Sequence, residues 1–176
     1  MVALLGAIGD KLARMEFLAA IEHTAFSVWI RESSWALFAF LIVHTISMGF
    51  VVGAAIALAV RAWVVASNSS LSSMAGLLPL AKVALATAVA SGLLLAFGYP
   101  TKAVTNPVFY LKLSLLAGAL LASRMLWRRG LMNSSQAVDE QASRTRMLAT
   151  VNVLLWIATL AAGKFLAYTY RILLAD

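Results

Sequence analysis

His44 is the residue of this sequence best placed for chemistry, because it interrupts an apolar run long enough to cross a membrane. It lies about ten residues, or roughly 15 Å, into that run, and its neighbours Leu41, Ile42, Val43 and Ile46 are apolar. A neutral imidazole at that depth needs a polar partner, since hydrocarbon offers none. Two interpretations stay open: a hydrogen bond to a neighbouring helix, or axial ligation of a b-type haem iron.

The only other histidine of the chain, His23, is the candidate for a second axial ligand. If the segment before His44 runs antiparallel to it with a turn near Ser33, both histidines stand about ten residues from the turn and are level. That geometry permits a bis-histidine haem. Met48 lies one turn from His44 on the same face, so it is no opposite ligand, and a soft copper ion held by these two residues is given little weight.

Three basic residues, Lys112, Lys164 and Arg31, form a second group of candidates. Both lysines lie inside apolar runs at similar depth, and Arg31 is near that depth on the same side. Together with the nearby tyrosines, such a layer could bind haem propionates, a quinone carbonyl or an anionic headgroup. The alternative is snorkelling lysines in an aromatic belt. We predict that Lys112 and Lys164 face each other's helices, or a ligand, rather than lipid.

Acidic residues are absent from the apolar runs, which disfavours other classes of function. No Asp or Glu lies between Glu32 and Asp139, whereas ion-coupled transporters usually carry a carboxylate inside the membrane. The motifs of serine hydrolases and zinc proteases are missing. The chain has no cysteine, which excludes thiolate metal sites, iron–sulfur clusters and c-type haem attachment. We therefore do not expect an enzyme on its own, although a part in an oxidoreductase complex stays open.

The elements that position these residues must be membrane helices. Of the 176 residues, 62% are apolar and 12% are charged, whereas soluble domains are about half apolar and a quarter charged. Four apolar runs are long enough to cross a bilayer: 34–60, 76–98, 107–127 and 148–170. Residues 10–30 mix apolar and charged positions, which predicts an interfacial amphipathic helix, with a short fifth span as the alternative. The sequence thus predicts one all-α domain over residues 1–176, an integral membrane four-helix bundle with an N-terminal amphipathic helix.

The net charge of +7 is gathered mostly at the ends of the apolar runs. There it orients the protein in the membrane, so we expect no nucleic-acid partner. The loop from Arg124 to Arg146 has the largest excess of arginine and is predicted to be cytoplasmic. The C-terminus then lies outside, which in a bacterium means the periplasm. The expected partners are the lipid bilayer and either other membrane-protein subunits or a second copy of the chain.

Four motifs spread over about Phe17 to Tyr170 have a familiar pattern. They are Trp29-x-Arg31-Glu32-Ser33, His44 followed by Gly49 and Gly53, Asn106-Pro107-x-Phe109-x-x-Lys112, and Trp156 with Gly163-Lys164-x-x-Ala167-Tyr168. This pattern resembles an uncharacterised family of small bacterial four-helix membrane proteins, known as a domain of unknown function. The family more often carries arginine at the position of Lys164. The resemblance implies the fold and a location in the bacterial inner membrane, and it implies no established activity.

These observations favour a small membrane subunit of a redox system that holds a b-type haem or a quinone near His44. The main alternative is a non-catalytic, cofactor-free accessory or scaffold subunit of a larger membrane complex. A third class, a channel or exporter for a small solute, ranks below both. A visible absorption spectrum of the purified protein separates the first two, since haem is coloured and a cofactor-free subunit is not.

Overall fold

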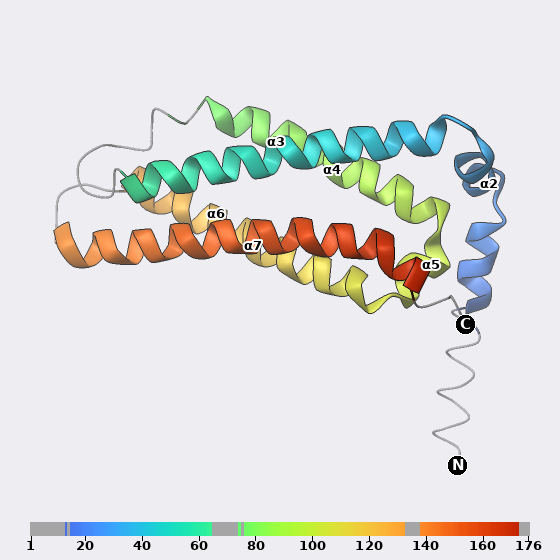
Figure 1. Ribbon diagram of the computed structural model, residues 1–176. Coiled ribbons are helices and arrows are strands. Elements are labelled where there is room, and N and C mark those ends of the chain that lie inside the picture. The colour runs from blue at the N-terminus through green and yellow to red at the C-terminus, as the bar shows by residue number, and fades with distance from the viewer. Residues whose placement is uncertain (1–12, 14, 65–73, 75, 133–137, 173–176) are drawn as a thin grey trace, which may run out of the picture. The chain divides into compact units, whose positions relative to one another are not determined.

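Helices make up the structure, a computed structural model that describes residues 13, 15–64, 74, 76–132 and 138–172. Figure 1 shows the labelled helices in chain order, and no strand occurs in this part of the chain. Their bounds are α2 Ala25–Glu32, α3 Ala36–Val64, α4 Leu77–Gly98, α5 Pro100–Thr105, α6 Pro107–Met132 and α7 Val138–Ile172. The predicted all-α fold is confirmed.

Four helices within the described ranges are long and apolar enough to cross a bilayer. They are Ala36–Val64, Leu77–Gly98, Pro107–Arg128 and Ala142–Leu166, with mean hydropathies between 1.4 and 2.1. Many of their large apolar side chains point outward, among them Phe38, 64% exposed, and Leu93, 67% exposed. A protein tolerates apolar exposure on this scale where lipid is its solvent. The chain is therefore a multi-pass membrane protein.

The four predicted runs coincide with α3, α4, α6 and α7, but the helix ends differ. α6 continues to Met132 and α7 begins at Val138, so both helices extend into the segment expected to be a polar loop. Polar residues at the end of an apolar run are compatible with helix as well as with loop. Hydropathy marks where a helix is apolar and does not mark where it stops. α5 lies in the gap between the second and third predicted runs.

The chain divides into two compact units, and α3 and α4 each contribute to both. The first unit comprises Met1–Ser47 and Ala86–Asn106, and therefore holds α2, the start of α3, the end of α4, and α5. The second unit comprises Met48–Leu85 and Pro107–Asp176. It combines the end of α3 and the start of α4 with α6 and α7, so four helices meet within it.

In the first unit, α2 is fixed to the end of α4 by a buried serine and a close contact. Thr24 caps α2 by accepting a hydrogen bond from the Ser27 amide. The Ser27 hydroxyl is buried and lies 3.1 Å from the carbonyl of Phe97 and 3.3 Å from that of Gly98, the last residues of α4. A Cβ atom on Gly98 would stand 2.9 Å from Cγ2 of the buried Ile30. Glycine at this position therefore lets α2 approach α4.

Alanine at position 98 is expected to destabilise the protein by about 1–3 kcal/mol, because the added methyl overlaps Ile30 in a packed contact. The midpoint of thermal unfolding in detergent measures the effect. Gly53→Ala is the matched control, since nothing lies within 4 Å of a Cβ atom at that helical position. Equal midpoints for Gly98→Ala and Gly53→Ala would contradict the account of α2 docking.

The predicted amphipathic helix over residues 10–30 is not continuous in the structure. Residues 15–22 are helical, a turn follows at His23 and Thr24, and α2 begins at Ala25. The Thr24 hydroxyl donates to the carbonyl of Ile21 at 2.7 Å while also capping α2, so one side chain ends one helix and starts the next. Residues 10–12 and Arg14 lie outside the described residues. Thr24 was a readable N-cap signal in the sequence.

Candidate functional site

His44 is anchored to α4 by a hydrogen bond that crosses between helices of the first unit. Its Nδ1 lies 2.9 Å from the carbonyl oxygen of Ala88 and 3.2 Å from the hydroxyl of Ser91. A carbonyl oxygen can only accept, so Nδ1 carries the proton and donates to Ala88. The Ser91 hydroxyl in turn donates to the carbonyl of Thr87, at 2.7 Å. In the neutral ring the lone pair therefore lies on Nε2.

Gly92 makes room for this contact. A Cβ atom at that position would stand 3.0 Å from Cε1 of His44 and 3.3 Å from Nδ1. Even a methyl group would therefore press on the ring that donates to Ala88. Ser91 places its hydroxyl near Nδ1 of His44, and Gly92, which has no side chain, leaves room for the imidazole ring. Sequence reasoning missed both, because a small polar residue beside a glycine is common in membrane helices and has no distinctive spacing.

His23, the predicted second ligand, is not level with His44. It is exposed and lies in the turn before α2. α2 is bonded through Ser27 to Gly98, the last residue of α4, and lies beyond the start of α3 rather than beside it (Figure 1). His44 contacts α4 at Ser91, about seven residues and roughly 10 Å further back. The two histidines are not aligned, because the helix of residues 15–22 ends before a turn at His23 and Thr24 and does not continue into α2.

Arg31 is held by Glu22, the residue before the turn. Its guanidinium lies 3.1 Å from the Glu22 carboxylate and donates to the Glu22 carbonyl at 2.8 Å. The other carboxylate oxygen accepts from the Thr101 hydroxyl of α5 at 2.6 Å. Both charged side chains are about a quarter exposed or less, so this pair contributes modestly to stability. Arg31 thus joins the residue 15–22 helix to α2, and its binding of a cofactor stays a prediction.

The two lysines of the second unit have different surroundings. Lys112 of α6 is half-buried and faces α7, where a Cβ atom on Gly163 would stand 3.6 Å from its Cε and 3.7 Å from its Nζ. Lys164 is exposed. The structure therefore brings Lys112 against a neighbouring helix, as predicted, and does not do so for Lys164. Gly163 lies in contact range of the end of the Lys112 side chain.

A buried polar network joins three helices of the second unit, and its centre was not predicted. The fully buried Asn152 of α7 accepts from the Ser123 hydroxyl of α6 at 2.7 Å and donates to the carbonyl of Ala55 on α3 at 3.3 Å. The indole nitrogen of Trp156 donates to the same Ser123 hydroxyl at 3.1 Å. Every polar side-chain atom of this network has a partner, so it can hold helices together inside hydrocarbon.

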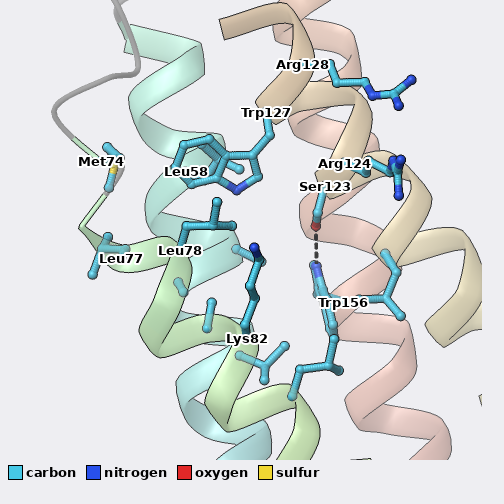
Figure 2. A pocket seen from close by; sticks show the side chains of 16 residues that line it. Leu58, Met74, Leu77, Leu78, Lys82, Ser123, Arg124, Trp127, Arg128 and Trp156 are labelled. Atoms are coloured by element: carbon cyan, nitrogen blue, oxygen red, sulfur yellow. Dashed lines mark hydrogen bonds between the residues drawn. The ribbon is translucent and has the colours of Figure 1, made fainter. Parts of the chain in front are cut away.

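A cavity of about 540 Å³ lies inside the second unit, next to this network. Its lining residues come from α3, α4, α6 and α7, together with Met74 just before α4. Most of them are apolar, and the charged ones are Lys82, Arg124 and Arg128. Figure 2 shows the Lys82 side chain extending from α4 toward Trp127, with the two arginines on α6. His44 is not among the residues that line this cavity.

Among the described residues, no group of three or more His, Asp or Glu side chains could hold a bare metal ion. A metal at His44 would have to bring ligands of its own, as haem iron does. Comparison of the chain with known protein families, curated proteins and solved structures finds no match. The resemblance to an uncharacterised family stays a prediction, and function is inferred from residues and geometry.

Proposed function

We propose that this protein is a small membrane subunit of a redox system, and that His44 holds the cofactor, a b-type haem or a quinone species. The observation that carries the proposal is the hydrogen bond from Nδ1 to the Ala88 carbonyl. Histidines that ligate metals almost always donate their other ring N–H in this way, which fixes the ring and raises the basicity of the ligating nitrogen. The ordinary cost of a polar side chain in a membrane helix adds support.

The tautomer distinguishes the cofactors. Because Nδ1 carries the proton of the neutral ring, Nε2 carries the lone pair and no hydrogen. It can ligate haem iron or accept a hydrogen bond from the hydroxyl of a quinol. It cannot donate to a quinone carbonyl unless the ring becomes doubly protonated. Haem, when bound, would supply one-electron chemistry, and this chain would supply the oriented ligand.

The absorption spectrum of the wild-type protein tests the proposal. Protein produced with ample haem supply and purified in mild detergent is expected to show a Soret band, with sharper bands at longer wavelength on reduction. If the cofactor is a quinol instead, the colourless protein should bind a ubiquinol analogue and not its quinone form. Protein that is colourless and binds neither would overturn the redox proposal.

A cofactor-free accessory subunit is the second candidate, and one observation favours it. The His44–Ala88 bond already gives the imidazole an interhelical partner, so it meets the cost of placing a polar group in the span without any ligand. In that case the protein would act through contacts with other membrane subunits or with a second copy. Both candidates place the chain as a subunit rather than as an enzyme on its own.

We also propose a location in the bacterial inner membrane, with the Arg124–Arg146 segment cytoplasmic and the C-terminus periplasmic. The excess of arginine in that segment supports this orientation. The chain has no cysteine, so single-cysteine variants report sidedness cleanly. Cysteine at the exposed Arg144 should react with a membrane-impermeant maleimide only after the cells are opened, whereas cysteine at the exposed Thr105 should react in intact cells. The reverse pattern would contradict the orientation.

A further inference from the structure

Three cations line the second-unit cavity. They are Lys82, Arg124 and Arg128, and among the residues that the structure describes no Asp or Glu lines it with them. In the described part of the chain, these three side chains form no ion pair or hydrogen bond. All three are exposed side chains that border the same hollow, and an anion bound there would interact favourably with each of them. The cavity therefore has the electrostatics of an anion site.

The rest of the lining is apolar, which a small soluble anion would not require. Leucines and alanines of α3 and α4 form one side, and Leu120, Trp127 and Trp156 form the other. The volume of about 540 Å³ lies in the range of roughly 300–1,000 Å³ that ordinary small-molecule sites occupy. A ligand that uses the whole cavity must carry an apolar chain as well as a negative charge.

The three cations also lie near the ends of the apolar helices that carry them. Lys82 follows the start of α4 at Leu77 by little more than one turn, and Arg128 is the last residue of the apolar part of α6. Phosphates of the bilayer lie beside such span ends, and basic pockets between membrane helices bind lipid headgroups. Figure 2 shows Lys82 reaching along this wall toward Trp127.

We infer that this cavity binds one anionic phospholipid, with its phosphate at Lys82, Arg124 and Arg128 and an acyl chain against the apolar walls. The lipid serves as a structural ligand that joins α4 to α6 at this end of the second unit. The inference does not depend on a redox role, because it uses neither His44 nor any residue of the first unit.

Native mass spectrometry of the full chain, with phosphatidylglycerol or phosphatidylcholine added to the detergent, tests the site. Wild-type protein should retain one phosphatidylglycerol and release phosphatidylcholine. The Lys82→Gln, Arg124→Gln, Arg128→Gln triple variant should bind phosphatidylglycerol at least about tenfold more weakly. Lys164→Gln is the control for loss of a positive charge elsewhere, since Lys164 lies outside the cavity lining, and it should bind as the wild type does.

A second variant, Ala81→Trp, fills the cavity while keeping all three cations, and it keeps the test decisive if the triple variant does not fold. It should also lose the lipid. Equal retention of both lipids by wild type, or retained phosphatidylglycerol in Ala81→Trp and in a folded triple variant, would overturn the inference. The inference would also be overturned if the protein retained inorganic phosphate or a free fatty acid as well as it retains phosphatidylglycerol, since either result means that no phospholipid is required.

Discussion

Trp156→Ala is expected to lower the free energy of unfolding by about 3–5 kcal/mol, the largest stability loss of any single truncation considered. Trp156 is only 1% exposed and lines the cavity of the second unit, so its removal would enlarge that cavity. The indole also donates to Ser123, which in turn donates to Asn152. Inside a membrane, helices are held by close packing and by such bonds rather than by the hydrophobic effect, so both losses act directly on helix association.

Three variants separate the packing part from the hydrogen-bond part when unfolding is measured in detergent. Trp156→Phe keeps much of the volume and loses the N–H donor, and we expect a loss of about 1 kcal/mol. Trp63→Ala makes the alanine change at an exposed tryptophan of the same unit and should have little effect. Asn152→Leu removes the network's centre and should cost about 0.6–1.7 kcal/mol. If Trp156→Ala and Trp63→Ala unfold alike, Trp156 does not hold the bundle together.

The membrane helices could be predicted from the sequence because their signal is local. An apolar run of twenty residues has few structural solutions, and all four such runs form helices. The ends of α6 and α7 could not be predicted in the same way, since a polar amphipathic turn is compatible with either helix or loop. The break at Thr24 was readable as an N-cap, but the amphipathic pattern on both sides of it favoured one continuous helix.

The candidate site shows the same division between local and non-local information. The cost of an imidazole in hydrocarbon singles out His44 from the sequence. Its partner does not follow from the sequence, because a backbone carbonyl such as that of Ala88 is present at every position and only the packing of α3 on α4 selects one. Gly92 becomes meaningful once that packing is known. Asn152 was different, since the cost argument that identified His44 applies to a buried amide in α7 as well.

Substitutions at His44 are expected to give the largest functional effect, and asparagine separates the two roles of the imidazole. The amide nitrogen of asparagine occupies nearly the position of Nδ1, so His44→Asn can still donate to the Ala88 carbonyl. It has no counterpart of Nε2 and cannot ligate haem iron. We expect His44→Asn to unfold near the wild-type temperature and to lack the Soret band entirely. His44→Ala loses both functions, and should lose the band together with about 0.6–1.7 kcal/mol of stability.

Gly92→Ala completes the series because it keeps His44 as the ligand and shifts the position of the His44 ring. The new methyl would press on Cε1 at 3.0 Å, so the ring must shift by a few tenths of an ångström. A haem held by His44 should then stay bound and change its reduction potential, since axial ligand geometry and the bond to Ala88 both tune the iron. A Soret band that survives in His44→Asn would remove His44 as the ligand. Colourless wild-type protein, with His44→Asn stable and His44→Ala destabilised, would instead assign His44 to helix packing and the chain to the cofactor-free subunits.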